Sequence, residues 1–277
     1  MTQISPPLSP RQTLPTMYDL PSEEIGDPGV PDEFHVFQPE LLRQTFRPPA
    51  YDPQEVFVAA DLNLYYDLRQ PQWYKRPDWF AVLGLPRLYD QTELRLSYVR
   101  WQEGVDPFVV VELLSPGTEK EDLGQTLRDA SQPPNKWTVY EQILKAPYYF
   151  VYDRYSDTLQ AFGLMMSRYQ PLPIEGQGVW LPEAQLGLGL WQGRYQGIER
   201  RWLRWYDKRG RWLPTPEEAE RQQVEEERLR AETEKQRAEE ERLRAEAEKQ
   251  RADSAEAELQ RLRRLLAEAG VNPQSAS

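Results

Sequence analysis

The sequence places two acidic residues in or beside apolar runs that are typical of buried strands. Asp78 follows Pro77 and opens the run Trp79 to Leu83, and Glu112 lies inside the run Phe108 to Leu114. A strand buried on both faces reads as a continuous apolar run, and an ionised carboxylate inside it is costly unless a cation or hydrogen bonds compensate it. Two acids on neighbouring strands, followed by Lys136, predict a divalent-metal site.

These residue types match the needs of phosphodiester hydrolysis. A hard cation takes two or three oxygen ligands, and a positive group helps to orient or deprotonate the attacking water. Asp78, Glu112 and Lys136 supply those groups, while Lys120 is a competing cation nearer in sequence. Three structural alternatives stay open: Asp78 only begins a strand, Glu112 only pairs with a core cation, and Lys136 is an exposed helix residue.

Composition excludes several other kinds of chemistry. The 277 residues include no cysteine, so disulfides, cysteine-bound zinc, iron–sulfur clusters and thiol nucleophiles are ruled out. The single histidine, His35, lies in a segment rich in proline and acid, which disfavours histidine triads and two-histidine metal sites. No signal peptide and no apolar run of membrane-spanning length occurs, so we expect a cytoplasmic protein without a membrane partner.

The net charge of −11 bears on a nucleic-acid partner. Proteins that bind duplexes autonomously usually carry an excess of Lys and Arg, because neutralising phosphates supplies much of the affinity. The acidic balance therefore disfavours tight autonomous binding of DNA. A local basic groove remains open, since five basic residues flank the candidate site: Arg87, Arg95, Arg100, Lys120 and Arg128.

Changes in composition predict the domain organisation. We expect a proline-rich leader over residues 1–50, with a short helix at Pro39 to Gln44, and an α/β domain over residues 51–213. Its fold is predicted as a restriction endonuclease-like mixed β-sheet flanked by helices, with a helix from Lys136 to Lys145 before the last core strands. The expected strands are Val56–Ala60, Asn63–Tyr66, Trp79–Leu83, Phe108–Leu114, Tyr148–Tyr152 and Leu159–Leu164.

A charged repeat follows the domain. Thr215 and Pro216 form a helix start, and Glu225 to Ala238 repeats almost identically as Glu239 to Ala252. We expect a helix or coiled coil over residues 214–270 and a disordered tail over 271–277. Two interpretations stay open: a solvated single helix, or a coiled coil that forms a homo-oligomer through Leu259, Leu262, Leu265 and Leu266.

The wider motif resembles the Uma2 family of restriction endonuclease-like proteins in the PD-(D/E)XK nuclease superfamily. The residues that carry the resemblance are Pro77-Asp78, Glu112 to Thr118, Asp122, Lys136 with Tyr140, and Pro147 to Asp153. The resemblance covers about residues 50–200, and an acidic heptad tail is common in cyanobacterial members.

The resemblance implies that Asp78 and Glu112 bind Mg²⁺ or Mn²⁺ and that Lys136 stabilises the phosphate or positions water. The chain departs from the superfamily pattern at Leu114, because the usual lysine position, two residues after the second acid, holds leucine. In Uma2 proteins the lysine is thought to have moved to the following helix. Many members also have an aspartate where this chain has Phe108, which leaves Asp106 as a reserve ligand.

Two functions of different classes follow from these features. The leading hypothesis is a metal-dependent endonuclease that cleaves DNA. The alternative is a catalytically inactive nuclease-fold adaptor that oligomerises or recruits partners through its C-terminal helix. A small phosphorylated substrate is a weaker option, because no glycine-rich phosphate loop is present.

Overall fold

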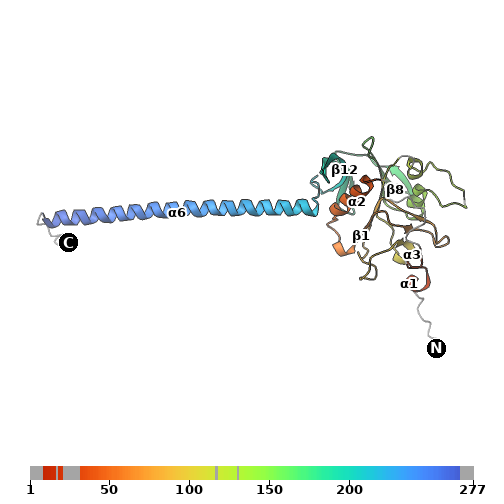
Figure 1. Ribbon diagram of the computed structural model, residues 1–277, viewed down its shortest axis with the longest axis horizontal. Coiled ribbons are helices and arrows are strands. Elements are labelled where there is room, and N and C mark those ends of the chain that lie inside the picture. The colour runs from red at the N-terminus through yellow and green to blue at the C-terminus, as the bar shows by residue number, and fades with distance from the viewer. Residues whose placement is uncertain (1–8, 17, 21–31, 116–117, 130, 269–277) are drawn as a thin grey trace, which may run out of the picture. The chain divides into compact units, whose positions relative to one another are not determined.

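The computed structural model describes residues 9–16, 18–20, 32–115, 118–129 and 131–268 (Figure 1). The chain divides into two compact units between Thr215 and Pro216. The tail predicted for residues 271–277 lies outside the described residues. Within the described ranges no helix combines the length and the apolar character needed to cross a bilayer.

The first unit is a mixed α/β structure, as the sequence predicts. Its helices are α1 (Pro10–Thr13), α2 (Phe34–Thr45), η1 (Pro53–Glu55), α3 (Arg100–Glu103), α4 (Glu119–Asp122), α5 (Lys136–Thr138) and the π-helix η2 (Val139–Ile143). Its strands are β1 (Val56–Ala59), β2 (Leu64–Tyr65), β3 (Tyr74–Lys75), β4 (Trp79–Leu83), β5 (Tyr98–Val99), β6 (Val109–Leu113), β7 (Tyr148–Asp153), β8 (Thr158–Met165), β9 (Arg168–Pro171), β10 (Gly178–Leu181), β11 (Leu186–Tyr195) and β12 (Ile198–Tyr206).

A six-stranded sheet with the order β1-β4-β6-β7-β8-β9 forms the centre of this unit. Strands β4 and β6 are antiparallel neighbours, with Trp79 opposite Val111, whereas β6 and β7 are parallel. The antiparallel pairing brings the start of β4 beside the end of β6. The two predicted acidic segments therefore meet at one edge of the sheet.

The side chains of β6 point alternately into two layers of the hydrophobic core. Val109, Val111 and Leu113 pack with α2 and the antiparallel sheet β10-β11-β12. Val110 and Leu114 pack with residues of α5 and η2 on the opposite face. Because side chains alternate along a strand, Glu112 points to the same face as Val110 and Leu114. Lys136 and Tyr140 come from the helices that cover that face.

Helix α2 begins earlier than the short helix predicted at Pro39 to Gln44. Asp32 Oδ1 accepts the backbone N–H groups of Phe34 and His35 at 2.9 and 3.2 Å, which caps the first turn. The Gln38 side chain exchanges two hydrogen bonds of 2.8 Å with the backbone of Leu203 in β12. Part of the segment expected as a leader is thus built into the core.

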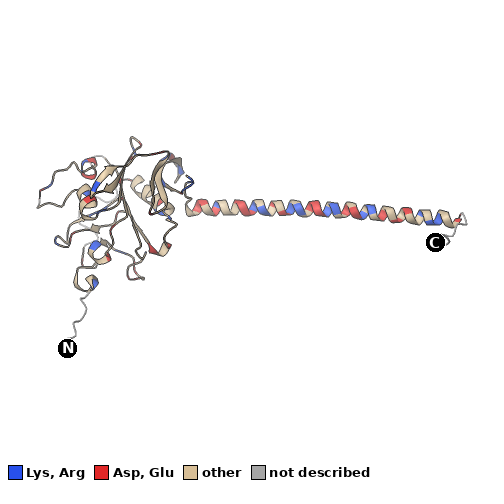
Figure 2. Cartoon of the chain, turned by 180° about the vertical axis from the view of Figure 1, so that it is seen from behind, with Lys and Arg blue, Asp and Glu red and all other residues tan. Residues whose placement is uncertain are grey.

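The second unit contains α6 (Pro216–Glu268), which has no buried residue. Charges of both signs alternate along it (Figure 2), and ion pairs three or four residues apart include Glu217 with Arg221 and Glu239 with Arg242. Such pairs support an exposed helix. The four leucines predicted to mediate association, Leu259, Leu262, Leu265 and Leu266, are between 42% and 56% exposed.

Candidate active site

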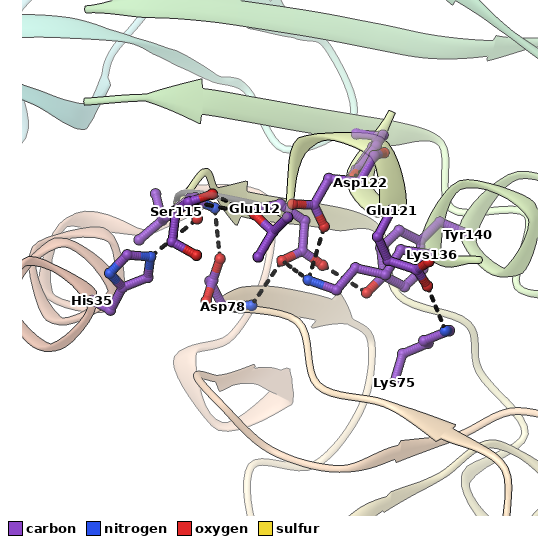
Figure 3. Close-up of polar contacts among 12 residues, drawn as sticks. His35, Lys75, Asp78, Glu112, Ser115, Glu121, Asp122, Lys136 and Tyr140 are labelled. Atoms are coloured by element: carbon purple, nitrogen blue, oxygen red, sulfur yellow. Dashed lines mark hydrogen bonds and ion pairs between the residues drawn. The ribbon is translucent and has the colours of Figure 1, made fainter. Parts of the chain in front are cut away.

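Asp78 and Glu112 lie together at the edge where β4 begins and β6 ends (Figure 3). The backbone N–H of Asp78 points to Glu112 Oε2 at 3.4 Å, and Asp78 Oδ2 accepts the backbone N–H of Leu113 at 2.6 Å. Glu112 is fully buried. The Asp78 carboxylate is thus oriented by the residue that follows Glu112.

Lys136 reaches both Glu112 and a second acid, Asp122. Its Nζ lies 2.9 Å from Glu112 Oε2 and 2.9 Å from Asp122 Oδ1 (Figure 3). Asn135 accepts the N–H of Thr138 at 2.8 Å and so caps the helix on which Lys136 is the first residue. Only 19% of the Lys136 side chain is exposed, so it is not a solvated helix residue. The competing cation Lys120 is exposed on α4.

Two further residues lie at the site without a role predicted from the sequence. Asp122, at the end of α4, is buried, and its backbone carbonyl accepts a hydrogen bond from the Tyr149 hydroxyl at 2.9 Å. The Tyr140 hydroxyl donates to Glu112 Oε1 at 2.7 Å. Each Glu112 oxygen therefore has its own donor, Tyr140 on one side and Lys136 on the other. Both residues belong to the sequence motif, which was the available signal.

Burial controls the protonation of the acids. It raises the pKa of Glu112 to about 7 and that of Asp122 to about 6, although the nearby Lys136 ammonium acts in the opposite direction. Burial also raises the pKa of Asp78. The pKa of Lys136 lies above its ordinary value, since the attraction of the three acids outweighs the effect of burial. One ammonium therefore compensates three carboxylates incompletely, while itself staying protonated.

Several basic residues that were candidates for a local basic groove are held in ion pairs. Arg95 pairs with Glu103 at 2.8 Å, with both side chains buried, and Arg128 pairs with Glu121 at 2.8 Å. Arg100 pairs with Asp106 at 2.5 Å. Asp106, the reserve ligand, therefore has a partner of its own and precedes β6 at the end opposite Leu113.

Glu121 is the centre of a second ion-pair cluster beside these acids. It binds Lys75 of β3 at 2.9 Å through Oε1 (Figure 3). Its Oε2 binds Arg128. Lys75 lies close enough to Lys136 for their charges to repel, and burial is the larger effect that lowers its pKa. A second ammonium group therefore lies near the acids, neutralised by a carboxylate of its own.

The donor set fits a hard divalent cation in chemical type and in charge. Asp78 and Glu112 offer carboxylate oxygens, which Mg²⁺ and Mn²⁺ prefer. Burial raises the pKa of both acids, so a bound cation would stabilise their ionised form. Within the described parts of the chain, no three acidic or histidine side chains converge as a ready-made metal cluster. The Lys136 ammonium lies between Glu112 and Asp122 instead.

Comparison with known proteins relates the chain to a protein family. The family model "Uma2: Putative restriction endonuclease" matches residues 12–196. A similar solved structure, "Crystal structure of a putative nuclease belonging to DUF820 from Anabaena variabilis ATCC 29413", is 10% identical with a TM-score of 0.33. That alignment covers 47% of this chain and 62% of the other, less than two thirds of its length. A search of curated proteins gave no significant match.

Proposed function

Because the chain belongs to the Uma2 family, whose model matches residues 12–196, we propose that residues 51–213 form a metal-dependent endonuclease that hydrolyses phosphodiester bonds in DNA. The observation that carries the proposal is the position of the Lys136 ammonium, 2.9 Å from both Glu112 and Asp122 and near enough to Asp78 for their charges to attract. Phosphoryl transfer uses a metal ion held by carboxylates together with a positive group that stabilises the transferring charge. DNA as substrate accords with the cytoplasmic location predicted from the sequence.

In this proposal each side chain has a defined task. Asp78 and Glu112 hold Mg²⁺ or Mn²⁺, which when bound supplies Lewis acidity and lowers the pKa of a water molecule. Lys136 stays protonated and stabilises negative charge on the phosphoryl oxygens. Asp122 fixes the direction of the Lys136 ammonium, and Tyr140 fixes the Glu112 carboxylate by donating to Oε1.

Metal removal tests the proposal directly. We expect the purified chain to nick supercoiled plasmid DNA with Mg²⁺ or Mn²⁺. Nicking should stop when EDTA is added, because EDTA removes the metal ion and the carboxylates at the site supply no other Lewis acid. Readdition of Mn²⁺ should restore nicking in the wild type and not in Glu112→Ala. Nicking that persists in EDTA, or equal nicking by Glu112→Ala, contradicts the proposal and indicates a contaminating nuclease.

A second candidate function, the inactive adaptor, is favoured by α6. This helix of 53 residues has no buried side chain, so its apolar residues are available to a partner. Its last heptads, with Leu259, Leu262 and Leu266 at coiled-coil spacing, offer an apolar stripe to a second copy of the chain. The preceding repeats contribute mainly alanine and charge to that stripe. Association therefore depends on the final two heptads.

A charged residue at the centre of this stripe is expected to convert the oligomer into a monomer. We expect the wild-type chain to have at least the mass of a dimer in light scattering, and Leu262→Glu to have the mass of a monomer, because a carboxylate at that position faces its copy across the seam. Leu229→Glu, exposed on the same helix outside the stripe, is the matched control and should keep the wild-type mass. A monomeric wild type excludes assembly through the tail.

A further inference from the structure

The only histidine of the chain is buried in the first turn of α2 and touches the strand that carries Glu112. His35 is 6% exposed. Its Nδ1 lies 3.0 Å from Asp32 Oδ1. Its Nε2 lies 3.0 Å from the backbone carbonyl oxygen of Leu113, 78 residues away, at the end of β6 (Figure 3). The ring therefore bridges the N-terminal segment and the end of β6.

Both partners of the ring are hydrogen-bond acceptors. The Leu113 carbonyl can only accept. Asp32 accepts two backbone N–H groups through Oδ1 and the Arg154 guanidinium through Oδ2 at 2.6 Å. Burial acts to raise the pKa of Asp32, but its contacts with His35 and Arg154 bring it below the ordinary value, so Asp32 is a carboxylate. The Nε2 atom must therefore carry the proton of the hydrogen bond to Leu113.

The Leu113 backbone is held on both sides of its Cα atom. Its N–H donates to Asp78 Oδ2 at 2.6 Å, and its carbonyl accepts from His35 Nε2. The residue immediately before it is Glu112. Fixing both backbone groups of Leu113 limits its rotation, which in turn limits where the two acids can lie.

We propose that His35 is a positioning residue that clamps the Leu113 carbonyl through Nε2 and thereby holds Asp78 and Glu112 in register. Its effect on cleavage rests on the proposed function, whereas its effect on Leu113 does not. Three charged groups surround the clamp: Asp32 and Arg154, which form an ion pair, and Arg200, which lies 4.5 Å from the centre of the Phe34 ring. The N-terminal segment is accordingly part of the proposed active site, through His35.

Two amide substitutions of His35 each remove a different one of the two hydrogen bonds of the ring. A glutamine amide nitrogen falls near the position of Nε2, so His35→Gln keeps a donor for the Leu113 carbonyl and loses the one facing Asp32. An asparagine nitrogen falls near Nδ1, so His35→Asn keeps the bond to Asp32 and loses the clamp. We expect exchange of the Leu113 amide proton to accelerate roughly tenfold in His35→Asn and to stay near wild type in His35→Gln.

The remaining measurements use the same pair of variants. The single histidine gives one set of imidazole ¹⁵N resonances, and we expect Nε2 to carry a proton in the metal-free protein. In the nicking assay, His35→Asn should lose roughly tenfold in kcat with little change in KM, and His35→Gln should recover most of it.

Three results overturn the clamp: a ring whose Nε2 carries no proton, equal Leu113 exchange in the two variants, or equal loss of kcat in both. A wild-type protein that does not cleave DNA contradicts only the proposed function. The resonance and exchange measurements still test the clamp, because they need no turnover. Matched melting temperatures of the two variants exclude a general loss of folding as the cause of a difference.

Discussion

Lys136→Met is expected to lower the rate of DNA nicking by roughly 10² to 10³-fold, the range found when a fixed group that stabilises transition-state charge is removed. The wild-type ammonium lies 2.9 Å from both Glu112 and Asp122. Methionine keeps most of the length and volume of the side chain and removes only its charge. Single-turnover nicking with saturating Mn²⁺ measures the loss at the chemical step.

The same substitution should destabilise the metal-free protein. Removing one partner of a buried ion pair costs about 3 to 5 kcal/mol when the other charge stays uncompensated. Glu112 and Asp122 are buried, with pKa values raised to about 7 and about 6 in the presence of Lys136, so both can take up protons at low pH. The destabilisation of Lys136→Met is therefore expected to be larger at pH 8 than at pH 5.5.

Lys120→Met is the matched control, because it removes the competing lysine from the exposed face of α4. We expect it to nick DNA and to unfold as the wild type does. A Lys120→Met variant that loses activity while Lys136→Met keeps it would transfer the catalytic role to Lys120. Unchanged stability of Lys136→Met at pH 8 would contradict the ion-pair geometry itself, whether or not the wild type cleaves DNA.

The meeting of Asp78 and Glu112 could be predicted from the sequence, because it depends on local patterns. Apolar runs identify β4 and β6, and a single carboxylate in such a run needs compensation. Antiparallel pairing of the two strands then brings the acids to one edge. The helix start at Lys136 was likewise predictable, and the Asn135 side chain caps it.

The contacts of Asp122 and His35 could not be predicted in the same way. Asp122 meets Lys136 only because the loop between them folds back, where Asn135 Nδ2 donates to the Thr126 carbonyl at 3.0 Å. No periodicity encodes the path of such a loop. His35 lies in a proline-rich stretch whose composition suggested no chemistry, and its contact with Leu113 depends on how α2 packs against β12.

Glu112→Gln is expected to flatten the pH dependence of stability in the metal-free protein. Burial raises the pKa of Glu112 from an ordinary 4.5 to about 7, so between these values the folded state holds a proton that the unfolded state has released. The resulting stabilisation is complete below about pH 4.5 and is lost as the pH rises through 7. At 1.36 kcal/mol for each pKa unit, Glu112 accounts for a loss of roughly 2 to 3 kcal/mol between pH 5 and pH 8.

Other groups at the site change this slope in predictable ways. Asp122, whose pKa burial raises to about 6, adds a loss of the same sign over a lower pH range. Glu112→Gln should reduce this contribution, because the Glu112 charge also raises the pKa of Asp122. The pKa of Lys136 is raised above its ordinary 10.5, so it stays protonated in both states throughout this window and adds no slope. Urea unfolding in EDTA at pH 5, 6, 7 and 8 gives the free energy of unfolding at each point. Glu119→Gln, exposed on α4, serves as the control.

Mn²⁺ should reverse the trend in the wild type. A divalent cation binds the ionised carboxylate and competes with its proton, so the stabilisation by a fixed Mn²⁺ concentration is expected to increase from pH 5.5 to pH 8. Glu112→Gln offers a neutral amide in place of the carboxylate and should gain little at either pH. Equal Mn²⁺ stabilisation of the two proteins would mean that the ion binds elsewhere, and parallel pH curves in EDTA would mean that Glu112 does not keep its proton in the folded state.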